Sequence, residues 1–187
     1  MAQKRRRALT GFHHVAIATD DLTSTHRFYT EAMGFELVKT VVAPTGSPSR
    51  GWAKHLFYDT GGPGLFAVWE LHDESIGAHG TAISTGLGLP EWVNHLAFDV
   101  ADTDALAAAA RRWQEHGIDV VELDHEWCRS IYATDPNGVL VEFCCTTRAF
   151  TDRDRAEAQR FLVDPAPPLG PMPPLVLHEA LAPDQLR

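Results

Sequence analysis

The sequence has no long hydrophobic run, few cysteines and a shortage of basic residues, and each deficit excludes a class of protein. No stretch approaches the ~18 apolar residues that cross a bilayer as a helix, so we expect no membrane partner. The three cysteines, Cys128, Cys144 and Cys145, are too few and too clustered for a disulfide framework, which favours a reducing, cytoplasmic location. There are 16 Lys and Arg residues against 25 Asp and Glu residues, and the net charge of −9 argues against a nucleic-acid partner.

The two ends of the chain differ in composition from its centre. Residues 1–8 contain the basic run Lys4–Arg7 with no apolar stretch after it, so we expect a disordered basic tail and not a secretory signal. Residues 149–187 predict a polar helix from about Asp152 to Leu162, followed by a proline-rich extended arm. With 44% hydrophobic residues, the chain is otherwise typical of a soluble globular protein.

Between these ends the chain repeats itself once. "HVAIATDDL" from His14 and "HLAFDVADT" from His95 both alternate large and small residues, as a strand does, and both continue into capping residues and a helical pattern. Each copy then predicts three further strands, so the expected fold is α+β with two βαβββ modules, residues 9–75 and 92–148. A glycine-rich inter-module loop, residues 76–91, joins them. Either module alone is marginal in size, so we expect one curved mixed sheet around a shared cleft.

Three side chains in this pattern can bind a metal ion. His14 and His95 occupy the same position of the repeat, on the strand face that carries small alanines, and we expect His13 to point the other way. Glu142 lies in an apolar strand, where a carboxylate is costly unless it is paired or bound to a cation. Two imidazoles and one carboxylate form a facial set that holds a divalent metal and leaves positions open. A lone histidine or glutamate in a strand is more often structural, so the prediction depends on the matched repeat.

The chain resembles the vicinal oxygen chelate superfamily, which includes glyoxalase I, extradiol dioxygenases and bleomycin-resistance proteins. The resemblance rests on the stretches "HHVAIATDDLTSTHRFYTEAMGFELV", "VNHLAFDV" and "YATDPNGVLVEF". It implies paired βαβββ modules around a metal cleft, with His14, His95 and Glu142 as metal ligands. The ligand pattern is most similar to that of type I extradiol dioxygenases.

The same resemblance implies catalytic roles for three further residues. Tyr132 matches a tyrosine that reaches the metal pocket in extradiol dioxygenases, although a tyrosine packed on the sheet would give the same pattern. His125 and His79 lie in regions where those enzymes place acid–base histidines. Phe66, Val68 and Phe143 are candidates for an apolar pocket around an aromatic ring.

The expected function is therefore Fe(II)-dependent extradiol cleavage, with a catechol-like aromatic and O2 as substrates. Mn, Zn, Ni or Co would suit the same ligands. The first alternative is a glyoxalase- or epimerase-like lyase or isomerase, for which Glu70 is a candidate fourth ligand. The second is a non-catalytic drug-binding resistance protein. We also expect a homodimer.

Overall fold

The structure is a computed structural model that describes residues 11–46 and 50–182. The expected basic tail, residues 1–8, lies outside the described residues. The chain forms two compact units: the first comprises the residues up to His95 together with Thr134–Leu140, and the second comprises the remainder. Among the described residues, none of the helices has both the length and the apolar content needed to cross a membrane.

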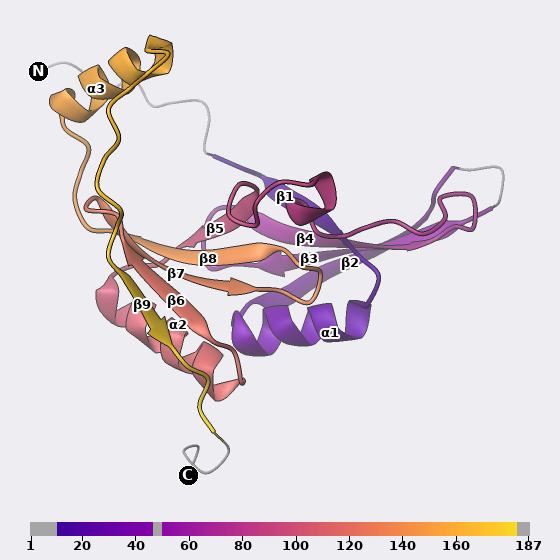
Figure 1. Ribbon diagram of the computed structural model, residues 1–187. Helices are drawn as coiled ribbons and strands as arrows, with labels where there is room; N and C mark the ends of the chain where they lie inside the picture. Colours follow the sequence, from indigo (N-terminus) through magenta and orange to yellow (C-terminus); the bar gives the residue numbers. More distant parts are fainter. Residues whose placement is uncertain (1–10, 47–49, 183–187) are drawn as a thin grey trace, which may run out of the picture. The chain divides into compact units, whose positions relative to one another are not determined.

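The first unit contains a four-stranded sheet in the order β1-β4-β3-β2 (Figure 1). β1 pairs in parallel with β4, and the other neighbours are antiparallel. This strand, helix and three strands are the first predicted βαβββ module. Its elements are β1 (His14–Thr19), α1 (Leu22–Arg27), the π-helical turn η1 (Phe28–Ala32), β2 (Glu36–Pro44), β3 (Trp52–Asp59) and β4 (Leu65–His72).

The helix of the first unit begins and ends where the local chemistry requires. The Asp21 carboxylate caps α1 by accepting a hydrogen bond from the Ser24 N–H at 3.0 Å. Gly34, with φ of +79°, follows η1 in the left-handed conformation that glycine adopts most easily. Tyr29 and Met33 turn inward and are 0% and 2% exposed, so the helix packs its apolar stripe against the sheet.

The second unit contains the sheet β5-β8-β7-β6-β9, except for the strand-end residues His95, Thr134 and Leu140, and the helix α2 covers one face of this sheet (Figure 1). Asp102 caps α2, and Trp113 from this helix is fully buried and stacks on Phe143 of the sheet at 5.3 Å between ring centroids. The second βαβββ module is thus present as predicted, but the strands form two sheets and not the one curved sheet that was expected, since each module closes its own set of strand pairs. Its elements are β5 (His95–Asp99), α2 (Thr103–Glu115), β6 (Val120–Asp124), β7 (Cys128–Thr134) and β8 (Leu140–Thr146).

The C-terminal residues add one expected element and one unexpected element. The helix α3 (Asp152–Val163) matches the prediction closely and starts with a capping box between Thr151 and Asp154. The proline-rich arm does not remain extended coil throughout, because β9 (Leu175–His178) pairs antiparallel with β6. Pro174 is the last proline before four residues that can donate backbone hydrogen bonds, and the strand begins immediately after it.

The turn between β7 and β8 belongs to the first unit. The Tyr29 hydroxyl donates a hydrogen bond of 2.8 Å to the Asp135 carboxylate, and the Thr81 hydroxyl donates one of 3.0 Å to the Asn137 carbonyl. Asp135 and Asn137 are both about 4% exposed. The boundaries of the sequence repeat therefore differ from those of the compact units at this turn.

Candidate functional site

His125, Tyr132 and Glu142 form a polar cluster in the second unit. Nε2 of His125, which directly follows β6, lies 3.0 Å from the hydroxyl of Tyr132 in β7. The Glu142 carboxylate in β8 also hydrogen-bonds this hydroxyl. Phe143 points to the face that α2 covers, so strand alternation directs Glu142 to the opposite face. The sequence-predicted Tyr132, His125 and Glu142 are therefore neighbours.

Burial governs the chemistry of this cluster. Burial raises the pKa of Tyr132; a hydrogen bond with Ser130 opposes this shift, and the nearby Glu142 carboxylate adds to it. The phenol therefore keeps its proton at neutral pH and can act as a hydrogen-bond donor. Glu142 is only 5% exposed, and a carboxylate so buried requires donors or a cation.

Residues on the same strand face as Tyr132 extend the cluster, and they include Ser130, which was not predicted from the sequence. Ser130 is fully buried, and its hydroxyl lies 3.9 Å from Sγ of Cys128. Burial raises the pKa of the Cys144 thiol to about 12, so this thiol is protonated and unreactive at neutral pH. The available signal was the spacing: Ser130 precedes Tyr132 by two residues in a predicted strand, so the two side chains lie on the same face.

His14 is the first residue of β1, and its side chain is exposed. Its ring contacts Phe57 at 5.5 Å and His55 at 5.8 Å between centroids. The expectation that His13 faces the other way was wrong, because Nδ1 of His13 lies 2.8 Å from Nδ1 of His14. His13 precedes the first residue of β1, so strand alternation does not determine the direction of its side chain.

His55 in β3 is a second residue of the His14 face that the sequence analysis did not select. It is 9% exposed, and its ring stacks on Trp69 at 3.8 Å. Its Nε2 has no hydrogen-bond partner among the described residues. Burial lowers the pKa of His55, and the neighbouring His14 adds to this shift, so the ring is neutral at pH 7.

His95 begins β5, which neighbours β8 in the second sheet. Nδ1 of His95 lies 2.9 Å from the carbonyl oxygen of Trp92. A carbonyl can only accept a hydrogen bond, so Nδ1 carries the proton and the lone pair of the neutral ring lies on Nε2. Metal-binding histidines commonly have this arrangement, because the outer hydrogen bond fixes the tautomer and the ring.

Residues 11–143 match the family model of the Glyoxalase/Bleomycin resistance protein/Dioxygenase superfamily. The chain belongs to this superfamily. A search of curated protein sequences finds no match.

Three solved structures illustrate the likeness. A glyoxylase/bleomycin resistance protein/dioxygenase domain from a Frankia species is 19% identical, with a TM-score of 0.56, 74% of this chain covered and 99% of the other. A candidate dioxygenase from Bacillus subtilis is 19% identical, with a TM-score of 0.55 and coverages of 72% and 40%. A lactoylglutathione lyase from Agrobacterium tumefaciens is 21% identical, with a TM-score of 0.50 and coverages of 73% and 94%. At these identities the likeness shows the shared fold alone.

Superfamily members typically depend on a divalent metal, and the donor set of this chain suits one chemically. His14 and His95 belong to the first unit and Glu142 to the second. Within the described residues, no group of three His, Cys, Asp or Glu side chains forms a metal cluster. The fit therefore rests on two local observations: the protonated Nδ1 of His95 and the burial of the Glu142 carboxylate.

Glu70 is not suited to be a fourth ligand beside His14. The register of β1 and β4 pairs His14 with Leu65 and Thr19 with Glu70, so the side chains of His14 and Glu70 lie on opposite faces of the sheet. The Glu70 carboxylate also contacts Lys54 at 2.7 Å. No register shift occurs between β3 and β4, so there is no bulge to redirect it.

The same register corrects the proposed aromatic pocket. Phe66 and Val68 alternate with Leu65 and are 1% and 0% exposed, so they belong to the core on the helix side. Phe143 is likewise committed to its contact with α2. None of these three side chains shares a strand face with His14 or Glu142.

His79 lies in the loop between the modules and is exposed. Its Nδ1 is 3.2 Å from the carbonyl oxygen of Gly77 in the same loop. This is a local bond within the first unit, and the catalytic role of His79 remains a prediction.

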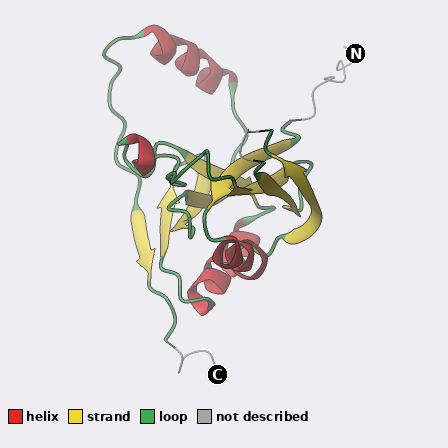
Figure 2. Cartoon of the chain, turned by 90° about the vertical axis from the view of Figure 1, so that its right-hand side faces the viewer, coloured by secondary structure: helices red, strands yellow, loops and turns green. Residues whose placement is uncertain are grey.

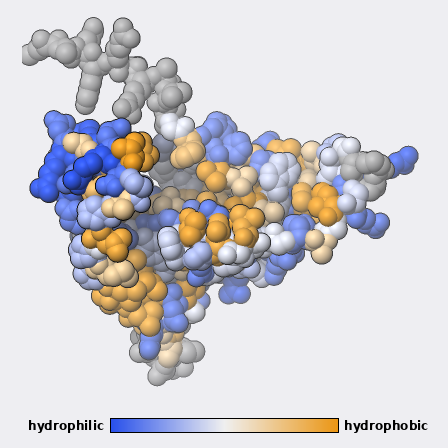
Figure 3. Space-filling model, turned by 45° about the horizontal axis from the view of Figure 1, so that its top comes forward, coloured by the Kyte–Doolittle hydropathy of each residue, from blue (hydrophilic) through white to orange (hydrophobic). Residues whose placement is uncertain are grey.

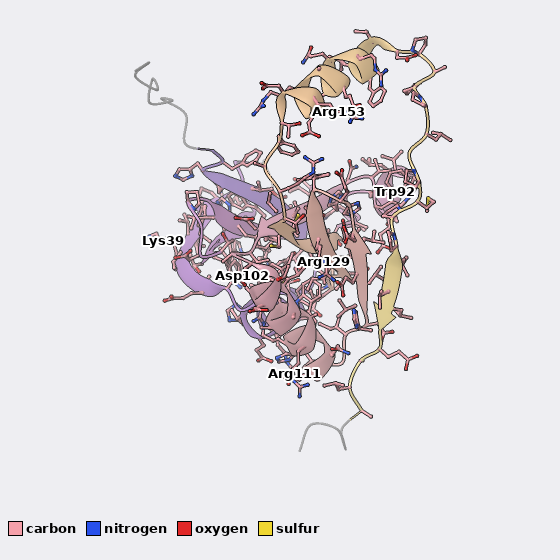
Figure 4. All side chains as sticks on the ribbon, turned by 90° about the vertical axis from the view of Figure 1, so that its left-hand side faces the viewer. Lys39, Trp92, Asp102, Arg111, Arg129 and Arg153 are labelled. Carbon is pink, nitrogen blue, oxygen red and sulfur yellow. The ribbon has the colours of Figure 1, made fainter. Side chains whose placement is uncertain are left out.

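A cavity of about 130 Å³ lies elsewhere in the second unit, between α2 and the strands it covers. Arg129 lies beside the helix that runs from Asp102 past Arg111 (Figure 4). Glu122 pairs with Arg129 there and with His178 at 2.8 Å. This cavity is on the opposite face from the predicted catalytic residues, since Arg129 alternates with Ser130 along β7. Its lining is Thr103, Leu106, Ala107, Ala110, Glu122, Arg129 and Ile131.

Proposed function

We propose that this superfamily member is an Fe(II)-dependent extradiol dioxygenase that cleaves a catechol-like aromatic. The observation that carries the proposal is the hydrogen-bonded series His125, Tyr132 and Glu142, in which the first distance is 3.0 Å. A buried carboxylate, a protonated phenol and an imidazole in direct contact form a route for one proton beside a candidate metal ligand.

His14, His95 and Glu142 are the residues that would hold the metal in this proposal. Three protein ligands leave coordination positions open, and a divalent ion bound there would supply a Lewis acid for two neighbouring substrate oxygens and a position for O2. The bond from His95 Nδ1–H to the Trp92 carbonyl holds that ring with Nε2 as the donor atom.

The remaining residues bind substrate and move protons. Tyr132 stays protonated because burial raises its pKa, and when substrate binds it donates its single hydroxyl proton to a substrate oxygen in place of the Glu142 carboxylate. His125 Nε2 accepts a proton from a catechol hydroxyl and returns it to the ring-opened product. Both atoms of O2 enter the product as one carbon–carbon bond beside the hydroxylated carbons breaks, so no external reductant is required.

The position of Glu70 favours this reaction over the glyoxalase- or epimerase-like alternative. That alternative benefits from a fourth protein ligand that moves the substrate proton. Glu70 lies on the other sheet face from His14 and is paired with Lys54 and His72. On the His14 face of β4 the first module offers Leu65, Ala67, Trp69 and Leu71, and none of these side chains binds metals.

The test is anaerobic loading with Fe(II), followed by addition of a panel of catechols and O2. We expect stoichiometric O2 uptake and a yellow ring-opened product. Alanine variants of His95 and Glu142 should lose bound iron, measured by elemental analysis, and should lose turnover. Glu70→Gln is the matched control, because it removes a carboxylate charge from the sheet face opposite His14. This variant should retain its bound iron and its turnover.

Two other outcomes would contradict the proposal. Turnover of a non-aromatic substrate without O2, supported by Zn, Ni, Co or Mn, would indicate a lyase or isomerase. Tight binding of a planar ligand to the metal-free protein, unchanged in the His95 and Glu142 variants, would indicate a drug-binding protein.

A further inference from the structure

Residues 149–182, here called the C-terminal arm, are attached to the second unit at both ends. At the first end the Arg148 guanidinium bonds to Glu126 at 3.0 Å and to Asp154 at 2.9 Å. At the other end β9 pairs with β6, and the Gln114 side chain donates a 2.7 Å hydrogen bond to the Glu179 carbonyl. The arm is therefore a loop with fixed ends and not a free tail (Figure 2).

The middle of the arm is rich in apolar side chains that remain exposed. None of the residues of α3 is buried, and the side chains of this helix, including Arg153, stand apart from those of the sheet (Figure 4). Figure 3 shows a hydrophobic patch next to the C-terminal end of the described chain, where β9 lies. The exposed large apolar residues of the arm are Phe150, Phe161, Leu162, Val163, Leu169, Met172, Leu175, Val176 and Leu177.

The apolar surface of the arm is comparable to that of a protein interface. Leu169 and Met172 are 97% and 90% exposed, and the nine side chains together expose on the order of 500 Å² of apolar area per copy. A standard interface buries about 800 Å² per partner, of which roughly 60% is apolar. A helix of 12 residues is also marginal in water without packing, which α3 lacks in the single chain.

β9 is an edge strand whose outer side is suited to pairing. The Asp124 N–H donates to the Pro174 carbonyl at 3.4 Å, so in this antiparallel ladder Val176 directs its backbone groups to β6. The backbone groups of Leu175 and Leu177 then point to the open edge. β2, one of the two edges of the first sheet, differs because it carries Lys39 and a register shift beside it, two features that discourage edge pairing. β9 has neither.

We propose that the partner of this surface is a second copy of the same chain, related by a two-fold axis at Val176. Antiparallel pairing of two β9 strands about this residue sets Leu175 of each copy opposite Leu177 of the other. These are the residues whose N–H and C=O groups point outward, so the hydrogen bonds of the combined sheet continue across the axis. The sequence Leu175-Val176-Leu177 reads the same in both directions, so a two-fold axis at Val176 places identical residue types opposite one another.

The experiment is light scattering coupled to size exclusion on the full chain over a range of concentrations. We expect a mass of about 41 kDa, twice the 20.6 kDa of one chain. The double substitution Leu175→Asp and Leu177→Asp should give the single-chain mass with an unchanged circular dichroism spectrum, because both side chains are exposed in one copy. Val42→Asp is the matched control: Val42 is 62% exposed on the β2 edge, against 63% for Leu175, and this variant should remain dimeric.

Amide exchange of the unmutated protein gives a second readout that does not depend on a variant. The N–H groups of Leu175 and Leu177 should exchange more slowly as concentration rises. A single-chain mass for the unmutated protein at all concentrations would overturn the proposal. So would a dimer that survives the double substitution, or one that Val42→Asp dissociates instead.

Discussion

Replacing Tyr132 with phenylalanine tests the hydrogen-bonded series directly. The substitution keeps the ring and removes the hydroxyl, which contacts His125 at 3.0 Å and the 5%-exposed Glu142. Loss of a donor to a buried carboxylate costs about 1–3 kcal/mol. For a chain of this length each kcal/mol lowers the melting temperature by about 2–4 °C, so we expect a fall of roughly 2–12 °C in thermal unfolding.

The same variant should lose activity by more than its lower stability explains. Loss of a positioned proton donor lowers turnover roughly 10²-fold or more, well below the melting temperature and with iron still bound. Tyr58→Phe is the control, because its hydroxyl also bonds a histidine, His26 at 3.1 Å, but belongs to the first unit. It should be destabilised and keep its turnover per bound iron. A Tyr132→Phe protein that melts and turns over like the unmutated protein would refute the assigned role of the hydroxyl.

Three further predictions concern stability and reactivity. Burial raises the pKa of Glu70, but the hydrogen bonds and charges of Lys54 and His72 outweigh burial, so the net pKa is lowered. The ionised Glu70 should therefore stabilise the fold by about 1 kcal/mol above the ordinary glutamate pKa, and this stabilisation should disappear as the pH falls through the lower pKa of the folded state. Urea unfolding of the unmutated protein and of Glu70→Gln at a series of pH values would show this. Trp113→Ala should cost about 3–5 kcal/mol, because the fully buried indole leaves a cavity; an unchanged denaturation midpoint would contradict this. The Cys144 thiol, with a pKa raised to about 12, should resist iodoacetamide at neutral pH until the protein is denatured, as mass spectrometry of the peptides would show.

The repeat made most of the fold predictable. The matched strands from His14 and His95, the capping aspartates and the glycines after each helix are local signals, and each led to the correct element. β9 was missed because four apolar residues after a proline-rich stretch give no local sign of a partner; β6 provides that partner from over fifty residues earlier. The packing of the turn at Asp135 on the first unit is also a long-range contact and left no pattern in the sequence.

The candidate site was predictable in its residue types and less so in its orientations. Tyr132, His125 and Glu142 were selected separately and lie together. Val68 and Glu70 were expected near the metal pocket, but the pairing of β1 with β4 places both on the sheet face opposite His14. Register is a property of paired strands, and a shift of one residue moves every side chain to the other face.

The Asp135 turn also has a consequence for synthesis on the ribosome. The residues up to His95 emerge first, but Tyr29 cannot donate its hydroxyl to Asp135 until about forty further residues have been added. At roughly 5–20 residues per second this delay lasts about 2–8 s. During that interval the nascent first unit is incomplete, so the two halves of the repeat cannot mature one after the other as separate pieces.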